Sequence, residues 1–294
     1  MTEPSMEASV ARLCFPRGVP GAVITNGGSE SDLLGLLLAK KDAAGAPVQV
    51  VCARSARSSV ARATEQLGMP PPLVLDSVGQ IPAKLGELAA ASVVVVSAGT
   101  AGTGTIDPLR EIGRLCRLRG SWLHVDAAGG GSALFSERLR PLLDGIEMAD
   151  SVTVELPELG VSTGLLAVRD VGSLTGVRMI GHPEMAAVFR ACRTQIGPSA
   201  ERRCDVATAL AAEIRARPGL RLWAEPALAT VVFRPGTATD EAVADLACDG
   251  LELTTVDDQT WLRIAVTGRR PLDDYVRLLT TDQVRVLGTT PNDR

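Results

Sequence analysis

Short apolar runs alternate with amphipathic stretches over the first 180 or so residues of the chain. The apolar runs are bounded by turn residues, which is typical of buried strands. They cover residues 48–52, 93–96, 122–126, 151–154 and 164–168. Helical patterns lie between them, near 30–43, 58–68, 80–91 and 107–119. Strands that alternate with helices predict an α/β domain with a mainly parallel central sheet covered on both faces. Ser29 is the predicted N-cap of the first of these helices, with Asp32 three residues later.

The pattern changes after residue 182. A long helical stretch covers 183–217, and Gly197-Pro198 predicts a break in it. Strand-like segments follow at 229–234 and 261–266, with helical segments near 239–248 and from residue 272. We therefore predict two domains, a large α/β domain over 1–182 and a smaller α+β domain over 183–294.

Composition excludes several classes of protein. The net charge of −4 comes from interspersed acids and bases without a basic stripe, so a nucleic-acid partner is not expected. No apolar run reaches the ~18 residues of a membrane span, and the acidic N-terminus lacks the pattern of a secretory signal. Six scattered cysteines predict reduced thiols, and two histidines without a cysteine cluster predict no metal site. We expect a cytoplasmic protein, and the scarcity of lysine beside arginine and alanine favours a bacterial source.

Four segments in the first 170 residues carry motifs in an order that one family shares. They are 21–34 with Gly27-Gly28-Ser29-Glu30, 98–108 with Ile106-Asp107-Pro108, 122–131 with His124-Val125-Asp126-Ala127-Ala128, and 144–151. By these motifs the chain resembles the group II pyridoxal-phosphate (PLP) dependent decarboxylases, which include glutamate and aromatic-amino-acid decarboxylases. The resemblance implies the PLP-dependent transferase (aspartate-aminotransferase-like) fold. It also implies a homodimer, since members of this fold build their sites at a two-fold interface.

The resemblance assigns cofactor-binding roles to four residues. Gly28 and Ser29 would lie at a helix N-terminus, where free amides and the helix dipole form an anion site for the cofactor phosphate. Asp126 would face the pyridine nitrogen and keep it protonated. Ala128 would lie under the ring, where a small side chain is needed.

Two positions depart from the family pattern. Arg57 stands where the family has a ring-stacking histidine, and Pro157-Glu158 replaces the His-Lys pair whose lysine forms the Schiff base. The sequence has only three lysines, Lys40, Lys41 and Lys84, all on predicted surface helices. A carboxylate cannot condense with an aldehyde, and beside a phosphate each unit-charge pair costs on the order of 3 kcal/mol. We therefore expect no cofactor, or PLP only if it binds non-covalently.

The first functional hypothesis is a repurposed, PLP-independent enzyme that acts on a small amino- or carboxy-bearing metabolite. Glu158 would be its general acid/base and Asp126 the second carboxylate. Arg57 would clamp a substrate carboxylate or phosphate. Candidates for further polar contacts are Thr100, Thr103 and His124. For His124, a hydrogen-bonded core histidine is the favoured interpretation.

Two alternatives stay open. The chain is a non-catalytic pseudoenzyme or scaffold subunit, in which Arg57 neutralises Glu158 or Asp126 because an unpaired buried charge is costly. Otherwise it is an amino-acid decarboxylase that uses PLP without a covalent tether, and turns over slowly because it lacks the lysine.

Overall fold

The protein is described by a computed structural model that covers residues 4–56, 58–88, 92–160, 163–177, 183–236 and 238–279. The chain divides into two compact units. The first comprises Met1–Ala101 and Ile106–Pro198, and the second Gly102–Thr105 and Ser199–Arg294. The predicted boundary after residue 182 falls beside residues 178–182, which lie outside the described part, and it stays a prediction.

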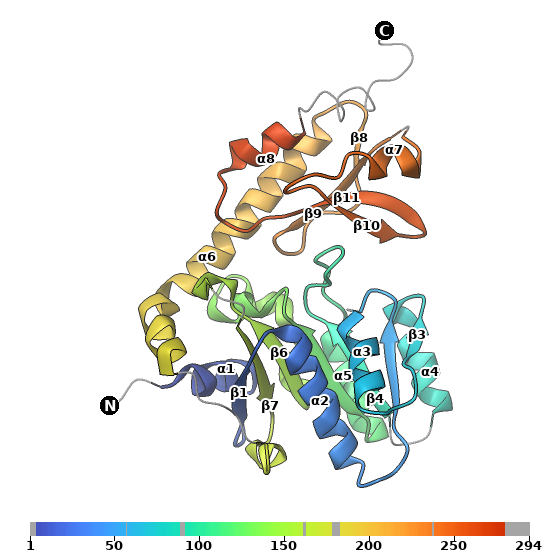
Figure 1. The fold of residues 1–294 in the computed structure, drawn as a ribbon, viewed down its shortest axis with the longest axis vertical. Helices are drawn as coiled ribbons and strands as arrows, with labels where there is room; N and C mark the ends of the chain where they lie inside the picture. Colours follow the sequence, from blue (N-terminus) through green and yellow to red (C-terminus); the bar gives the residue numbers. More distant parts are fainter. Residues whose placement is uncertain are drawn as a thin grey trace. The chain divides into compact units, whose positions relative to one another are not determined.

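A seven-stranded sheet forms the centre of the first unit (Figure 1). Its order is β1 (Gly21–Thr25), β7 (Gly164–Val168), β6 (Ser151–Glu155), β5 (Trp122–Ala127), β4 (Ser92–Ser97), β2 (Gln49–Ala53) and β3 (Leu73–Leu75). Strands β2 to β6 pair in parallel, while β7 is antiparallel to both of its neighbours. The predicted α/β fold with a mainly parallel sheet is therefore confirmed.

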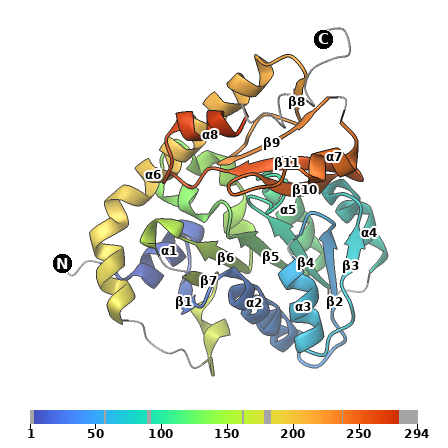
Figure 2. The ribbon, with the colours of Figure 1, turned by 45° about the horizontal axis from the view of Figure 1, so that its top comes forward.

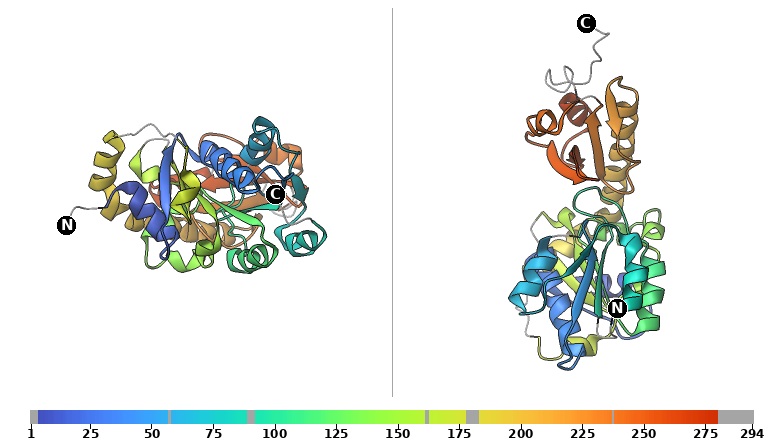
Figure 3. Two further views of the ribbon diagram at one scale, coloured as in Figure 1. Left: turned by 90° about the horizontal axis from the view of Figure 1, so that it is seen from below. Right: turned by 90° about the vertical axis from the view of Figure 1, so that its right-hand side faces the viewer.

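Helices cover both faces of this sheet. Figure 3 shows α2 (Gly28–Asp42) and α3 (Ser58–Gln66) on one face, and α4 (Ile81–Glu87) and α5 (Leu109–Arg119) on the other. The central strand β4 has four consecutive valines at 1% exposure or less, because helices bury it from both sides. Helix α1 (Met6–Cys14) packs on β1 and β7.

The topology brings several strand ends to one edge of the sheet. Strand β1 runs parallel to β6 because both are antiparallel to β7. The carboxyl ends of β1, β4, β5 and β6 therefore share an edge, which is where open α/β sheets bind ligands.

The turn between β1 and α2 depends on two glycines. Gly27, not Ser29, is the N-cap of α2, so the predicted Ser29 cap is wrong. Gly27 has φ of 104°, a conformation that favours glycine over any residue with a Cβ. A Cβ on Gly164 of β7 would lie 2.5 Å from the carbonyl carbon of Gly27. Glycine at 164 therefore lets this turn pass close over β7.

The second unit is a four-stranded antiparallel sheet with helices. Its order is β10 (Glu252–Val256), β11 (Gln259–Ala265), β9 (Thr230–Pro235) and β8 (Leu220–Leu222), and Figure 2 shows β9, β11 and β10 side by side. Residues of α6 (Pro183–Arg215), α7 (Asp240–Ala244) and α8 (Leu272–Leu278) contribute to its apolar core. The predicted break at Gly197-Pro198 is wrong, since α6 continues through Pro198. Buried Ile196 before the proline and Leu210 after it hold the helix on both sides of the lost hydrogen bond.

The cysteines differ strongly in burial. Burial raises the pKa of Cys14 and Cys116 to about 12 and that of Cys52 to about 11, whereas Cys248 is exposed. We expect these three buried thiols to resist a disulfide-exchange reagent near pH 8, because almost none of each is thiolate. Cys248 should be modified first, and all six cysteines only after denaturation. Peptide mapping checks this, and equal rates at Cys52 and Cys248 would contradict it.

None of the described helices is both long enough and apolar enough to cross a membrane.

Candidate functional site

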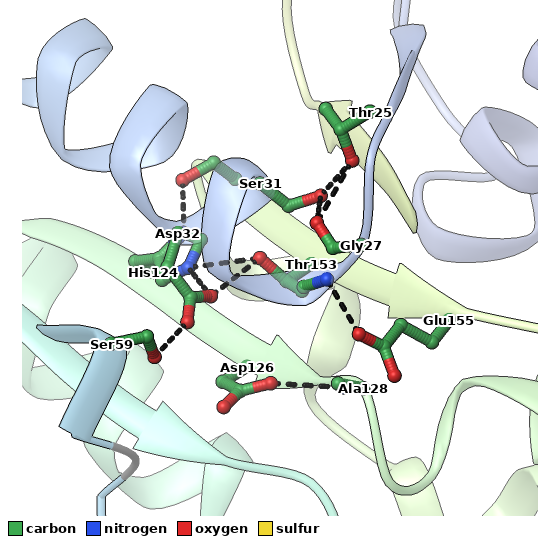
Figure 4. A network of polar contacts seen from close by, with 12 residues as sticks. Thr25, Gly27, Ser31, Asp32, Ser59, His124, Asp126, Ala128, Thr153 and Glu155 are labelled. Carbon is green, nitrogen blue, oxygen red and sulfur yellow. Dashed lines mark hydrogen bonds and ion pairs between the residues drawn. The ribbon is translucent and has the colours of Figure 1, made fainter. Parts of the chain in front are cut away.

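The candidate site lies in the first unit, at the edge where β1, β5 and β6 end (Figure 4). Three short segments build it. The turn Thr25–Gly28 leads into α2, Asp126 lies at the end of β5 with Ala128 just after it, and Glu155 ends β6.

Asp126 is a buried carboxylate with a fixed orientation. Only 3% of the residue is exposed, and its Oδ1 accepts a hydrogen bond from the backbone N–H of Ala128 at 3.0 Å. Ala128 is itself 8% exposed, so the surface beside this carboxylate is small and apolar. The pair can present an acid next to the edge of a flat ring.

The first amide of α2 is an occupied anion site. The backbone N–H of Gly28 donates to Oε1 of Glu155 at 2.5 Å, and Figure 4 shows the Glu155 side chain below the turn at Gly27. An N-terminal helix amide has no partner within its own helix, and the helix dipole favours a negative charge there. The carboxylate of Glu155 therefore fills the position at which Gly28 was predicted to bind an anion. Ser29, the other residue predicted there, is exposed.

Glu155 is a site residue that sequence reasoning missed. The signal available was its place directly after the apolar run of β6, at the carboxyl end of a strand. Asp107 of the Ile106-Asp107-Pro108 motif lies at the same edge, where its Oδ2 accepts from the Ser97 N–H at 2.7 Å and so ties the loop after β4 to the end of that strand. Burial raises the pKa of Asp107, and the Ser97 hydrogen bond offsets part of that rise.

Glu158 lies just beyond Glu155, in the short 3-10 helix η5 (Pro157–Leu159). It is half-buried, and its Oε2 accepts from the Ser132 hydroxyl at 2.7 Å. Asp126 lies at the end of β5, and Glu158 follows the neighbouring strand β6. Arg57 lies outside the described residues, so the predicted convergence of Arg57, Asp126 and Glu158 stays a prediction.

His124 belongs to a buried polar network beneath the site. His124 and Asp32 are both 0% exposed, and His124 Nε2 lies 3.2 Å from Asp32 Oδ1. The other ring nitrogen, Nδ1, is 2.8 Å from Ser151 Oγ. The structure thus places His124 against α2 and β6, and it supports the strand that carries Asp126.

Asp32 collects most of the hydrogen bonds in this network. It accepts from Ser59 at 2.6 Å and from Thr153 at 2.8 Å, in addition to its contact with His124. Burial alone would raise the pKa of Asp32, but the hydrogen bonds and charge of His124, with the two hydroxyl donors, hold that pKa below its ordinary value. Asp32 is therefore an ionised carboxylate inside the first unit.

The remaining predicted contacts lie in two places. Thr100 is buried in the first unit, in the loop after β4. Thr103 belongs to the second unit, where its Oγ1 lies 3.0 Å from that of Thr105. A substrate role for either threonine stays a prediction.

All three lysines of the chain have partners away from this edge. Lys40 and Lys41 lie in the last turn of α2, about 18 Å along the helix from Gly28. Their ammonium groups donate to the carbonyls of Leu67 and Thr175. Lys84 pairs with Glu87 at 2.8 Å. Among the described residues, no group of three or more His, Cys, Asp or Glu could hold a metal ion.

The structure defines an α/β protein of the PLP-dependent transferase fold with a candidate ligand site at the carboxyl edge of its sheet. Residues 6–177 match the family described as pyridoxal-dependent decarboxylase conserved domain, so the chain belongs to this family. The predicted membership in the group II PLP-dependent decarboxylases is confirmed.

Relatives and solved structures support the assignment. The chain is 32% identical over 187 residues to the L-2,4-diaminobutyrate decarboxylase of Acinetobacter baumannii, a match covering 50% of the chain and 37% of that protein. It is 33% identical over 175 residues to the mouse cysteine sulfinic acid decarboxylase, covering 48% and 36%. The chain thus matches little more than a third of either relative's length.

Two solved structures have the same fold. The glutamate decarboxylase domain of a diaminobutyrate-pyruvate transaminase and L-2,4-diaminobutyrate decarboxylase from Vibrio parahaemolyticus superposes with a TM-score of 0.82 at 22% identity, covering 96% of this chain and 71% of that one. Oryza sativa TDC, solved with PLP and tryptamine, gives a TM-score of 0.81 at 20% identity, covering 95% and 74%.

These matches correct one prediction. No cofactor was expected, or PLP only without a covalent bond. The family is pyridoxal-dependent, its relatives are decarboxylases, and one structure of the same fold holds PLP. The expectation of no cofactor is wrong, because it inferred the loss of binding from the loss of one tethering residue.

Proposed function

We propose that this chain is a PLP-binding member of the decarboxylase family that holds its cofactor reversibly, without a bond to a lysine. The observation that carries the proposal is the residue at position 158. A glutamate whose carboxylate accepts from Ser132 stands where the resemblance places the lysine, and the three lysines of the sequence are engaged elsewhere.

The site residues fit the cofactor at its ring end. Asp126 is placed to hold a proton on the ring nitrogen, since its carboxylate is buried and oriented by the Ala128 amide. Ala128 offers a small surface for the ring to lie on. At the phosphate end, the Gly28 amide fits an anion, provided that Glu155 gives up its hydrogen bond.

The chain's own residues suggest what chemistry follows. PLP, when bound, supplies an electron sink for amino-acid substrates. Glu158 Oε2, held by Ser132, can take up or release a proton at the edge of the site. A carboxylate does not replace a lysine as a tether, so we propose slow turnover or binding alone. The family relatives make a small amino acid the proposed substrate class. A bacterial source, a homodimer and a cytoplasmic location are further proposals.

Equilibrium dialysis followed by borohydride reduction tests this function. We expect saturable PLP binding that dialysis removes, and no mass increase on the intact protein after reduction. Asp126→Asn should weaken PLP binding by roughly ten- to a hundred-fold, because a hydrogen bond to a charged group contributes ~1.5–3 kcal/mol. A reduced adduct on a peptide with Lys40, Lys41 or Lys84 would contradict the proposal, as would the absence of saturable binding.

A further inference from the structure

Glu155 is a carboxylate at the phosphate end of the proposed site, where the cofactor itself brings negative charge. It is half-buried at the end of β6, and it reaches across 127 positions of sequence to the Gly28 amide. The N-cap residue of α2 is Gly27, which has no side chain to satisfy that amide. A residue from a different strand therefore performs the capping.

The strand register holds Glu155 at this place. Gly164 of β7 pairs with Glu155 on one side and with Thr25 of β1 on the other. The ends of β6 and β1 are thus separated by a single glycine, over which the turn at Gly27 passes closely. Because Gly164 has no side chain, the turn at Gly27 can lie close to β7, and the Gly28 amide comes within hydrogen-bond distance of the Glu155 carboxylate.

The Gly28 amide can serve only one anion at a time. A phosphate that binds there has to displace the Glu155 carboxylate and then tolerate its negative charge nearby. Unit charges of the same sign about 5 Å apart repel each other even at an effective dielectric constant of ~20, and a bound phosphate carries nearly two charges. A ligand without a phosphate contacts only the ring end of the site. It does not have to displace the Glu155 carboxylate, and it is not repelled by the charge of that carboxylate.

We propose that Glu155 is a specificity-determining residue, a built-in anion that competes with the ligand phosphate for the Gly28 amide. The site consequently disfavours ligands that carry a phosphate, and it binds PLP much more weakly than the same site would without Glu155. This inference rests on the proposed PLP site. If Glu155 were only a structural cap of α2, its removal would affect stability but leave the preference between phosphorylated and unphosphorylated ligands unchanged.

The test measures two ligands against three variants. PLP and pyridoxal share a ring and an aldehyde but differ in the phosphate, so the ratio of their dissociation constants isolates the phosphate end. Glu155→Gln removes the charge and keeps an acceptor for the Gly28 amide, whereas Glu155→Ala also empties the position. Glu30→Gln is the matched control, because Glu30 lies in the first turn of α2 but accepts from Asn26 at 2.5 and 2.8 Å.

We expect Glu155→Ala to tighten PLP binding by at least about tenfold and to change pyridoxal binding by less than about twofold. Glu155→Gln should fall between the wild type and Glu155→Ala. Glu30→Gln should change PLP affinity by less than about threefold. Equilibrium dialysis gives each constant, and inorganic phosphate should compete with PLP more effectively in Glu155→Ala than in the wild type.

Three results would overturn the inference: unchanged PLP affinity in both Glu155 variants, an equal gain for pyridoxal, or a gain in Glu30→Gln as large as that in Glu155→Gln. Glu155→Gln is nearly isosteric with the wild type. If Glu155→Ala fails to fold, the PLP affinities of the wild type and Glu155→Gln can therefore still be compared. The two proposals can fail separately. Wild type that binds no PLP while Glu155→Ala does bind it would refute the proposed function and support this inference.

Discussion

Asp32→Asn is expected to lower the free energy of unfolding by about 3–5 kcal/mol near pH 7. Asp32 and His124 are both completely buried, with 3.2 Å between Oδ1 and Nε2. An asparagine would remove the charge that faces His124, and it would turn an NH₂ group toward a hydroxyl that now donates to the carboxylate. Urea unfolding of the two proteins, followed by circular dichroism, measures the difference.

The pH dependence of this difference has a definite sign. The pKa of Asp32 is lowered in the folded protein, so the stabilisation is fully present above the unfolded value of ~3.9. It is lost as the pH falls through the folded pKa, where the carboxylate takes up a proton. The gap between wild type and Asp32→Asn should therefore narrow only below about pH 4.

The control is an acid that makes an exposed ion pair. Asp76 pairs with Arg54 at 2.6 Å, and the two side chains are 74% and 64% exposed. Asp76→Asn should cost less than about 1 kcal/mol, since solvent screens such pairs. Equal losses in Asp76→Asn and Asp32→Asn would show that the buried network has no special role.

The sequence predicts the central strands of the fold well and its edges poorly. Strand β4 is unmistakable because helices bury both of its faces, which requires an unbroken apolar run. Strand β3 lies at the sheet edge, has three residues and follows prolines, so no periodic pattern announces it. In β10 the residues are exposed or half-exposed and polar threonines dominate, which hides the strand in the same way.

In the candidate site, too, the sequence reveals some features and not others. Asp126 and Gly28 are visible in the sequence because they stand in short motifs whose residues are close in the chain. The contact between Gly28 and Glu155 joins residues 127 positions apart, and the buried pair Asp32 and His124 spans 92. Such partners are determined by strand order and register, which a single sequence does not reveal. Single positions were predictable, but their partners were not.

In the proposed PLP site, three carboxylates determine how the cofactor is held. Asp126 matches the ring end, Glu155 occupies the amide for the phosphate, and Glu158 stands in the position of the tether. We propose that Asp126 favours PLP binding, whereas Glu155 competes with its phosphate and Glu158 provides no amine for a covalent bond. The two obstacles are independent, so each can be removed separately.

Glu158→Lys is expected to convert reversible PLP binding into a covalent attachment that borohydride makes permanent. The substitution places an amine where the resemblance puts the family's lysine, in η5 at the end of β6. It also changes the local charge by two units, which favours a phosphate. Mass spectrometry of the reduced protein should show close to one adduct per chain, on the peptide that carries the substitution.

Two variants make this result specific to position 158. Glu158→Gln removes the carboxylate without adding an amine, so it should yield no adduct. Glu65→Lys adds an amine to an exposed position of α3, and only a trace of adduct is expected there because this position is not part of the proposed PLP site. If folded Glu158→Lys binds PLP reversibly and is not labelled, position 158 does not face the cofactor. The lack of a covalent bond to PLP would then result from the position of η5 and not from the missing amine.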